Sequence, residues 1–461
     1  MKILFVQPDS LNPVVNAGMH FYNFEPLGLS YVAATVEDYH DLCLIDLNNE
    51  AEPDTAFRQT IRAFQPDVIA FSARTSSNTG RVLQLAQITK DIDRKIITVV
   101  GGIHVMLWPY DFFQKVDVVI WRNPMGNFPV TVKMIAQGRR LKVVQAMIDT
   151  SFVPSVTLQS YPNPNRELST RYKYHIAIGR PGFEQVLQPV VSIKTSSGCP
   201  YRCNFCCLWK ICPRYEIRDI AGIVQEIASL TPENIFLADD ESFIEADYMF
   251  ELAGAIISSG INKRFIMYTR ADTVAKNPWL LEKWASAGLV EAWIGIDGFS
   301  DKQLEAYKKE DTTTSHAKAI NICRQNAVSV HGTSMINQNF TQDDFDHLLN
   351  YTSMELGLTS CHFFVLTPFK GTVLYERTNP NNLLTDNSDH FSLRQTVLKP
   401  HHMSVEEFHR RYADLQKYFN SDSMPYTARV ANFPDQLLPE FGMLVKENEN
   451  LYQAILRVSY E

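Results

Sequence analysis

The feature that most constrains the fold is the alternation of short apolar runs with helix-like segments, which occurs in two separate series. In the first series, the apolar runs include KILFVQP (2–8), DVIAFSA (67–73) and KIITVVGG (95–102). Apolar runs of this length between helices are typical of a parallel sheet that helices cover on both faces. Residues 1–140 are therefore predicted to form a doubly wound α/β domain, which binds ligands at the carboxyl ends of its strands.

The second series contains six apolar runs, each followed by helical segments. The strands are predicted at 190–196, 233–240, 264–272, 290–297, 327–336 and 360–368. Six strand–helix repeats make an open partial barrel, three quarters of the eight-stranded form, with its reactive groups at the carboxyl ends of the strands. We predict this barrel over residues 189–375. A linker is expected over 141–188, and a helical region that caps the barrel mouth over 376–461.

Composition limits the class of protein. The 461 residues exceed one ordinary core, in agreement with several domains. The net charge of −8 argues against a general nucleic-acid binder. The N-terminal residues MKILFVQPDS do not resemble a signal peptide, and no stretch approaches the roughly 20 apolar residues of a membrane helix. With eight cysteines, too few for a disulfide scaffold, we expect a cytoplasmic protein without nucleic-acid or membrane partners.

Four cysteines crowd the segment SGCPYRCNFCCLW, directly after the first barrel strand. Cys199, Cys203 and Cys206 have the spacing C-x3-C-x2-C, which lets three thiolates converge from one loop. Soft thiolates select zinc or iron–sulfur, and a structural zinc normally takes four protein ligands. Three ligands leave one iron of a 4Fe-4S cluster open, with a zinc knuckle or a chance grouping as the alternative. Cys207 and Cys212 are interpreted as packing residues, with a ligand or redox role as the alternative.

The cysteine motif, Phe205 before its last cysteine and the six strand–helix units resemble the radical S-adenosylmethionine (SAM) superfamily over about residues 190–375. The segment TPFKGTVLY (367–375) resembles the TP-x-PGT-x-LY element of a large subgroup, with Lys370 in place of the usual proline. The resemblance implies that the open iron binds SAM and that the cluster donates the electron that cleaves it. The resulting 5′-deoxyadenosyl radical abstracts hydrogen from a substrate. It also implies packing of Phe205 on the adenine, and an electron donor such as flavodoxin or ferredoxin.

By the same resemblance, residues at the ends of successive barrel strands hold SAM. The second strand ends at Asp239, Asp240 and Glu241, where a carboxylate suits the SAM ammonium. Helix capping is the alternative role for these acids. Arg270 ends the third strand, where it pairs either with the SAM carboxylate or with a surface acid. The candidates on the fourth and fifth strands are Asp297 for the ribose hydroxyls, Thr333 and Ser334.

A doubly wound domain in front of such a barrel resembles the cobalamin-binding class of this superfamily. The resemblance rests on PLGLSYVAA (26–34), PDVIAFSARTS (66–76) and GGIHVMLWP (101–109). It implies that Gly101 and Gly102 let a flat ligand approach the backbone. The remaining candidates are Arg74 beneath the cobalt, Thr75 and Ser76 at the corrin amides, and His104 at the corrin edge. The alternatives are a solvated loop position for the arginine and a structural role for the histidine.

Two departures from the class concern cobalamin itself. The signature D-x-H-x-x-G is missing, as is normal in this class. Relatives follow the fifth strand with RGEGE, whereas this chain has WRNPMG (121–126), so that an acidic, glycine-rich turn has become bulky. This departure indicates either an altered cobalamin site or a vestigial one.

The sequence leaves three functions open. The first is a cobalamin-dependent radical SAM methyltransferase that acts on an unactivated carbon of a small natural-product intermediate, with both cofactors facing one another across a domain interface. The second is a radical SAM enzyme with a vestigial cobalamin domain, which rearranges, cyclises or deoxygenates its substrate or transfers the aminocarboxypropyl group of SAM. The third is a metal-stabilised binding protein without turnover. The sequence indicates no catalytic residue and no particular substrate.

Overall fold

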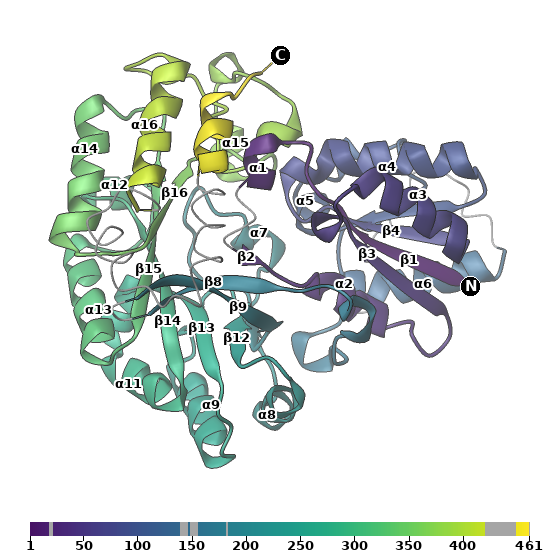
Figure 1. The fold of residues 1–461 in the computed structure, drawn as a ribbon, viewed down its shortest axis with the longest axis horizontal. Coiled ribbons are helices and arrows are strands. Elements are labelled where there is room, and N and C mark those ends of the chain that lie inside the picture. Colours follow the sequence, from purple (N-terminus) through teal and green to yellow (C-terminus); the bar gives the residue numbers. More distant parts are fainter. Residues whose placement is uncertain (18–21, 139–145, 148–154, 181–182, 420–448, 461) are drawn as a thin grey trace.

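The computed structural model describes residues 1–17, 22–138, 146–147, 155–180, 183–419 and 449–460. The chain forms two lobes, the first at the right and the second at the left in Figure 1. Each lobe is built around one sheet.

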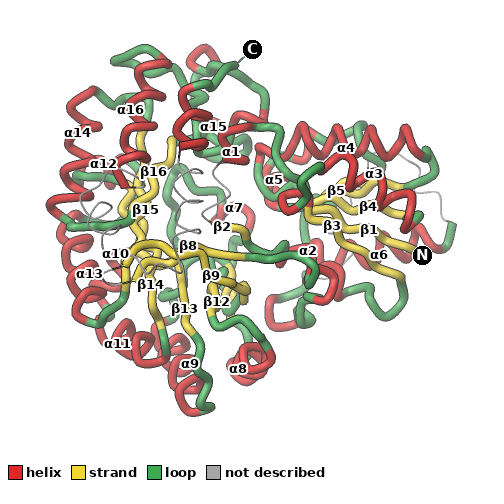
Figure 2. Tube along the Cα trace, viewed as in Figure 1, coloured by secondary structure: helices red, strands yellow, loops and turns green. Residues whose placement is uncertain are grey.

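The first lobe contains a parallel sheet with the strand order β3-β1-β4-β5-β6-β7. Its strands are β1 (Lys2–Gln7), β3 (Asp41–Asp46), β4 (Val68–Ser72), β5 (Ile97–Gly101), β6 (Val118–Val119) and β7 (Ala146–Met147). Helices α2 (Leu27–Ala34) and α6 (Pro124–Ala136) cover one face, and α3 (Pro53–Phe64) and α4 (Thr79–Ile92) cover the other (Figure 2). The predicted doubly wound fold is confirmed.

Local sequence explains how these helices begin and end. Pro53 occupies the first turn of α3, where a backbone N–H would have no partner within the helix. Gln65 ends the helix in the left-handed conformation, with φ of 53°. Phe57 and Ile61 lie one turn apart on the buried side. A polar helix with one apolar stripe packs on the sheet in this way.

The second lobe contains six parallel strands in the order β16-β15-β14-β13-β12-β9. These strands are β9 (Phe183–Ile193), β12 (Asn234–Leu237), β13 (Arg264–Arg270), β14 (Leu289–Asp297), β15 (Ser329–Ile336) and β16 (Cys361–Val365). The outer helices are α8 (Ile220–Ser229), α9 (Ala246–Ser258), α10 (Ala271–Lys276), α11 (Pro278–Ala287), α12 (Asp301–Ala306), α13 (Thr313–Gln325) and α14 (Gln342–Asn350). The predicted partial barrel is confirmed.

Two further strands extend this sheet beyond the prediction. Strand β8 (His175–Arg180) pairs antiparallel with β9, and β2 (Tyr22–Asn23) pairs antiparallel with β8. The stretch 141–188, expected to be a linker, therefore supplies part of the barrel sheet. The first lobe's chain supplies its edge strand.

The C-terminal region is helical, but its longest described helix does not cover the barrel mouth. Helix α16 (Val405–Lys417) packs within the helix layer beside α14 and against β16. The Tyr412 hydroxyl and the Gln416 amide both donate to the Phe363 carbonyl oxygen, at 3.2 Å and 2.7 Å. Helix α16 thus belongs to the helix layer of the barrel, and residues 420–448 of the predicted cap lie outside the described residues.

Buried ion pairs join the lobes on one side. Arg166 Nη1 lies 3.2 Å from Glu25 Oε1, and its Nη2 donates to Glu226 Oε1 at 2.8 Å. The same Glu25 oxygen accepts the N–H of Ser192 at 2.9 Å. Removing one partner of such a buried network leaves an uncompensated charge, so these contacts fix the lobes relative to one another.

A second set of polar contacts joins the lobes on another side. The ring of His104 bonds through Nδ1 to the Ser76 hydroxyl and through Nε2 to Asp111 Oδ2, both at 2.9 Å. Asp111 also accepts from the Ser388 hydroxyl at 2.6 Å, and Lys370 Nζ lies 3.7 Å from its other oxygen. Lys370, in the place of the usual proline, thus reaches across to the first lobe.

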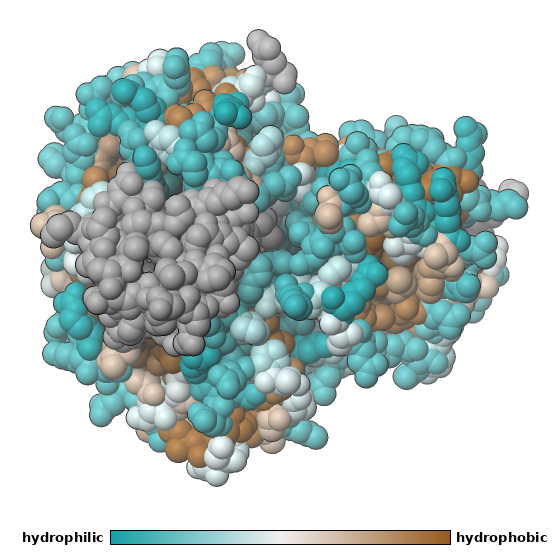
Figure 3. Space-filling model, in the orientation of Figure 1, coloured by the Kyte–Doolittle hydropathy of each residue, from teal (hydrophilic) through white to brown (hydrophobic). Residues whose placement is uncertain are grey.

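Among the described residues, hydrophilic side chains make up most of the surface visible in Figure 3. Smaller apolar areas lie over the first lobe and over the lower helices of the second (Figure 3). Within the described ranges, no helix is both long enough and apolar enough to cross a membrane.

Candidate functional site

The loop that carries the cysteine motif leaves the barrel sheet after β9. Its ends are joined by the short antiparallel strands β10 (Ser196–Ser197) and β11 (Glu216–Ile217). Gly198 opens the loop with φ of +94°, and a Cβ there would lie 2.2 Å from the Arg214 carbonyl oxygen. Only glycine fits this crossing, which holds the two ends of the loop together.

The three motif cysteines lie near one another in this loop. Burial raises the pKa of Cys199 to about 11 and also raises the pKa values of Cys203 and Cys206. The neighbouring thiols raise these pKa values further. Cys203 raises the pKa of Cys199, and both raise the pKa of Cys206. The free thiols are therefore neutral, and iron must displace their protons. Among the described residues, no three His, Cys, Asp or Glu side chains converge tightly enough to hold a single metal ion.

The other two cysteines of the segment have different electrostatic neighbours. Cys207 and Cys212 flank the short helix α7 (Leu208–Ile211). Burial raises the pKa values of both thiols, and the charge of Asp240 raises them further. The Ser197 hydroxyl donates a long hydrogen bond, 3.9 Å, to the Cys212 sulfur. Their interpretation as packing residues stays a prediction.

Asp239 is buried behind the cysteine loop. Its carboxylate accepts the backbone N–H groups of Thr195 and Ser196, both at 2.8 Å, and the Thr195 hydroxyl. The side chain thus ties the end of β12 to the segment that leads into the loop. The carboxylate is enclosed and bonded to three protein donors, which favours this bracing role over the predicted contact with the SAM ammonium.

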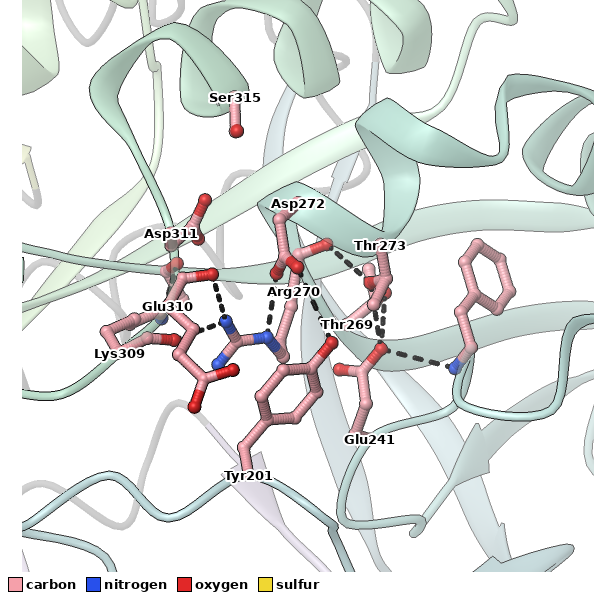
Figure 4. Close-up of polar contacts among 12 residues, drawn as sticks. Tyr201, Glu241, Thr269, Arg270, Asp272, Thr273, Lys309, Glu310, Asp311 and Ser315 are labelled. Atoms are coloured by element: carbon pink, nitrogen blue, oxygen red, sulfur yellow. Dashed lines mark hydrogen bonds and ion pairs between the residues drawn. The ribbon is translucent and has the colours of Figure 1, made fainter.

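The next two carboxylates also brace the strand end. Asp240 Oδ2 accepts the N–H of Gly198 at 2.7 Å. Glu241 accepts the hydroxyls of Thr269 and Thr273, at 3.1 Å and 3.0 Å (Figure 4). Burial raises the pKa of Glu241 to about 7. Only Asp240 among the three strand-end acids keeps appreciable solvent access, so only it remains a candidate for the ammonium.

Arg270 is buried at the barrel mouth, between Asp272 and the 309–311 segment (Figure 4). Its Nε donates to Asp272 Oδ1 at 2.7 Å. Its Nη2 donates to the Lys309 carbonyl oxygen and, at 3.2 Å, to that of Glu310. The alternative of a surface ion pair is therefore wrong.

The same guanidinium adjoins the cysteine loop. Its central carbon lies 3.7 Å from the centre of the Tyr201 ring, and Nη1 lies 3.9 Å from the Cys203 sulfur. A stacked, buried cation beside a cysteine stabilises negative charge on that sulfur. Tyr201 was missed in the sequence, where only its position between two motif cysteines could have marked it.

Asp297 pairs with a lysine that the sequence analysis also missed. Lys309 Nζ forms an ion pair with Asp297 Oδ2 and donates to the Gly295 carbonyl oxygen at 2.9 Å. Lys309 is only 3% exposed, and its charge lowers the pKa of Cys203 against the effect of burial. The run KKED (308–311) did not indicate a buried lysine, because runs of charged residues usually mark a solvated face.

The two candidates on β15 lie on opposite faces, as neighbouring strand residues do. Thr333 shares a face with Met335, which packs with Phe205 near the mouth. Ser334 is fully buried on the face of Ile336, which belongs to the helix-covered core. This orientation gives no support to the prediction that Ser334 reaches the SAM pocket.

Phe205 contributes to a small apolar cluster at the mouth. Its ring meets Tyr307 edge-on, with 5.8 Å between the ring centres, and Met335 and Leu366 complete the cluster. The residue is half-buried, so one part of the ring stays accessible. Its predicted contact with the adenine is compatible with this position.

A cavity of about 410 Å³ lies where β1, β4 and β5 of the first lobe meet the barrel. The chain reverses direction through the sheet between β1 and β4, the expected place for a ligand in a doubly wound fold. The lining is mostly apolar and includes Phe5, Ala70, Val99, Met106, Phe128 and, from the barrel, Phe236. The volume is typical of a small-molecule site.

The glycines at this cavity have unequal roles. A Cβ on Gly102, whose φ is +115°, would lie 2.6 Å from the Ala73 carbonyl oxygen, so Gly102 serves backbone packing. A Cβ on Gly101 would meet only Ile120, at 3.9 Å. Gly28, which the sequence analysis did not select, faces the cavity with nothing within 4 Å of a Cβ. The prediction of ligand approach therefore fits Gly101 better than Gly102.

The polar candidates of the first lobe divide in the same way. Arg74 is exposed and lines the cavity. The side chains of Thr75 and Ser76 bond within the protein, to Asn78 Oδ1 at 2.8 Å and to His104 at 2.9 Å. His104 is buried, and neither it nor the two hydroxyl residues line the cavity. The predicted corrin contacts of Thr75, Ser76 and His104 are therefore not supported. The contacts of His104 support its structural role instead.

The bulky turn at 121–126 leaves the cavity open. The Trp121 indole donates to the Met106 carbonyl oxygen at 3.0 Å, and the Arg122 guanidinium lies over the indole. Asn123 has φ of 45°, and Pro124 begins α6. Of these, Pro124 lines the cavity, whereas Trp121 does not. The turn is altered, but it does not fill the place of a ligand.

Two family models match the chain in the order of its lobes. The B12 binding domain matches residues 15–123, and the Radical SAM superfamily matches residues 193–352. The chain belongs to the cobalamin-binding class of the radical SAM superfamily. It is an enzyme of this class, and the cofactors of the class are a 4Fe-4S cluster, SAM and cobalamin.

Some relatives of this radical SAM protein carry methyltransferase names, and others are named anaerobic magnesium-protoporphyrin IX monomethyl ester cyclase. Hopanoid C-3 methylase of Methylococcus capsulatus is 25% identical over 441 residues, which cover 93% of this chain and 82% of the methylase. An uncharacterised methyltransferase of Pyrococcus horikoshii is 24% identical over 483 residues, covering 100% and 99%.

Solved structures share the whole arrangement of lobes. The cobalamin-dependent SAM radical enzyme OxsB with aqua-cobalamin bound has a TM-score of 0.69 at 14% identity, covering 98% of this chain and 72% of OxsB. The methyltransferase TsrM of Kitasatospora setae, with cobalamin and a 4Fe-4S cluster bound, has a TM-score of 0.64 at 16% identity, covering 98% and 99%. At these identities the likeness establishes the fold.

The residues of this radical SAM protein fit its cofactors. Three neutral thiols that form no disulfide share one braced loop. The buried cation Arg270 lies beside them, and this arrangement suits an anionic thiolate cluster. In the apolar cavity of the first lobe, Gly28 and Gly101 leave the backbone open to the approach of a flat ring, and Arg74 supplies one exposed cation.

Proposed function

We propose that this protein is a cobalamin-dependent radical SAM methyltransferase that acts on carbon in a small molecule. The observation that carries the proposal is the position of β12. Phe236 of β12 and Ala238, which directly follows the strand, line the first-lobe cavity. The next two residues, Asp239 and Asp240, brace the cysteine loop. The proposed cobalamin and cluster sites are thus neighbours along one strand.

The three motif cysteines are proposed as the cluster ligands, and the mouth residues as the SAM pocket. When bound, the cluster supplies an electron that cleaves SAM, and cobalamin carries a methyl group. Asp240, with its solvent access, is proposed to receive the SAM ammonium. Phe205 is proposed to pack on the adenine, and Thr333 lies on the face where it would contribute to the same pocket. Arg270 and Lys309 hold positive charge beside Cys203.

The pairing of Asp297 with Lys309 bears on its predicted role. Its Oδ2 is engaged by the lysine, and the residue is only half-buried. The other carboxylate oxygen is proposed to accept a ribose hydroxyl. The lysine fixes the orientation of that oxygen.

Arg74 is proposed to lie beneath the cobalt, since it is the exposed cation of the cavity wall. A guanidinium does not coordinate metal and would disfavour a ligand on that face. A one-electron reductant is required by this class of enzyme, and a flavodoxin or ferredoxin is proposed for that role.

The test is anaerobic reconstitution with iron, sulfide and hydroxocobalamin, followed by desalting. Roughly four irons and one cobalamin per chain are expected. With titanium(III) citrate added to reduce the cluster and the cobalamin, SAM with a deuterated methyl group should give S-adenosylhomocysteine. In the presence of substrate it should also give a labelled product together with 5′-deoxyadenosine. Four irons without retained cobalamin would contradict the proposal and favour radical chemistry with a vestigial first lobe.

A further inference from the structure

Four aromatic side chains pack in a row that leads from the cavity between the lobes along β12, β13 and β14 of the barrel, and we call Phe24, Phe236, Tyr268 and Trp293 the aromatic wall. Phe24 stacks on Phe236 with 4.5 Å between ring centres. Tyr268 meets Phe236 and Trp293 edge-on, at 5.4 Å and 5.1 Å. Edge-to-face packing of this kind holds the rings in fixed orientations.

The wall runs from the first-lobe cavity toward the barrel mouth. Phe24 and Phe236 both line the cavity. Tyr268 precedes Arg270 by two positions on β13, so that their side chains leave the strand on the same face. The wall therefore lies between the proposed cobalamin site and the SAM pocket, where a substrate must meet both.

Tyr268 differs from its neighbours in accessibility. Phe236 and Trp293 are each 4% exposed, whereas Tyr268 is 36% exposed. Burial nevertheless raises the pKa of Tyr268, because protein surrounds it on most sides although water reaches it. The positive charge of Arg74, on the cavity wall, lowers the pKa of this phenol against the effect of burial.

The wall offers one available polar group. Trp293 donates its indole N–H to Glu291 Oε1 at 2.7 Å, so that only its ring surface is left for a ligand. The two phenylalanines have no polar atoms. Within the described part of the chain, no hydrogen bond is formed by the Tyr268 hydroxyl, which stays protonated at neutral pH and can donate one.

We propose that Tyr268 contacts the substrate, and that the substrate is an uncharged, largely apolar ring compound with one hydroxyl or carbonyl oxygen. The accessible rings of Tyr268 and Phe24 would contact the apolar body, with Phe236 and Trp293 packed behind them. The Tyr268 hydroxyl would donate to the oxygen and orient the carbon that reacts. A charged substrate is disfavoured, since the four side chains of the wall carry no charge and the guanidinium that acts on Tyr268, that of Arg74, is assigned to the cobalamin site. This inference rests on the proposed function and specifies the substrate class for it.

The test measures binding without turnover, on anaerobic holoenzyme from which SAM is omitted. The probes are a pentacyclic triterpene alcohol and the hydrocarbon of the same skeleton, each delivered from cyclodextrin and quantified by mass spectrometry. The wild type should bind the alcohol about five- to tenfold more tightly than the hydrocarbon, as one hydrogen bond provides. Tyr268→Phe should bind both equally, at the affinity of the hydrocarbon.

Two further variants separate the hydroxyl from the wall. Phe236→Leu should weaken both probes by a similar factor while the preference for the alcohol remains. Tyr39→Phe, which removes a hydroxyl from a side chain that is 80% exposed on the first lobe, should behave as the wild type. Tryptophan, a charged amphiphile, should not compete with either probe.

Equal binding of the two probes by the wild type, or an unchanged preference in Tyr268→Phe, would overturn the inference. Competition by tryptophan would overturn the uncharged class. The proposed function is read separately, from the change in the cobalamin spectrum when SAM is added, without substrate, to enzyme reduced with titanium(III) citrate. If this change persists while neither probe binds, the substrate class fails and the methyltransferase proposal stands.

Discussion

The barrel mouth and the first-lobe cavity occupy equivalent places, at the carboxyl ends of parallel strands, but their side chains are opposite in character. At the mouth, buried acids and bases are paired with the backbone and with one another. The cavity wall is apolar, with one exposed guanidinium at Arg74. Buried polar groups must find partners, so a strand-end acid such as Asp239 becomes a brace unless solvent or a ligand reaches it.

The largest effect should come from the cluster ligands. Cys203→Ala should abolish iron loading and all SAM cleavage, because one of three thiolates is lost beside Arg270. Iron content and 5′-deoxyadenosine are measured after anaerobic reconstitution. Cys43→Ala, which alters a thiol of β3 in the first lobe, should load iron as the wild type does. Cleavage at wild-type rates by Cys203→Ala would show that the cluster lies elsewhere.

The mouth is expected to depend on its braces. Asp239→Ala leaves the N–H groups of Thr195 and Ser196 buried without an acceptor, which should cost about 2–5 kcal/mol of unfolding free energy. Urea denaturation of the apoprotein measures this loss, and iron retention should fall with it. Unchanged stability with weakened SAM binding would instead mean that Asp239 binds SAM directly.

The corresponding test in the first lobe compares adjacent glycines. Gly102→Ala should destabilise the protein by about 2–4 kcal/mol, because φ is +115° and the new Cβ would collide with the Ala73 carbonyl oxygen. Gly101→Ala should change stability by less than about 1 kcal/mol, since its Cβ would have room. Equal losses in urea denaturation would contradict this distinction.

A smaller effect concerns pH and the Glu241 carboxyl. Because the folded protein raises its pKa from 4.5 to about 7, its contribution to stability is full below pH 4.5 and is lost as pH rises to 7. Urea denaturation of the apoprotein at pH 5 and pH 8 should show that Glu241→Gln removes up to about 3 kcal/mol of this dependence. An identical pH profile in the variant would mean that the carboxyl is ionised throughout.

Most of the fold could be predicted from the sequence, because periodicity reports which face of each element is buried. The strands and helices of both lobes follow apolar runs and amphipathic segments closely, as α3 and β13 do. The added strands β8 and β2 could not be predicted in this way. Their pairing depends on contacts between distant parts of the chain, which no local pattern records.

The candidate site was predicted less completely, since motifs indicate which residues lie near a site but not where their side chains point. The cysteine motif and Arg270 lie together at the mouth as expected. Ser334 faces the helices, and Lys309 and Tyr268 carried no signal of their own. Orientation depends on strand face and tertiary packing, which become visible only in the structure.

Strand β2 has a consequence for how the protein is made. The ribosome completes Tyr22–Asn23 before it has synthesised the strand with which they pair, so this piece of the barrel sheet must wait for its partner while the first lobe folds around it. A gene fragment that begins after the first lobe would yield a barrel with the edge of β8 uncovered, and such an edge promotes self-association. The two lobes therefore need to be translated as one polypeptide.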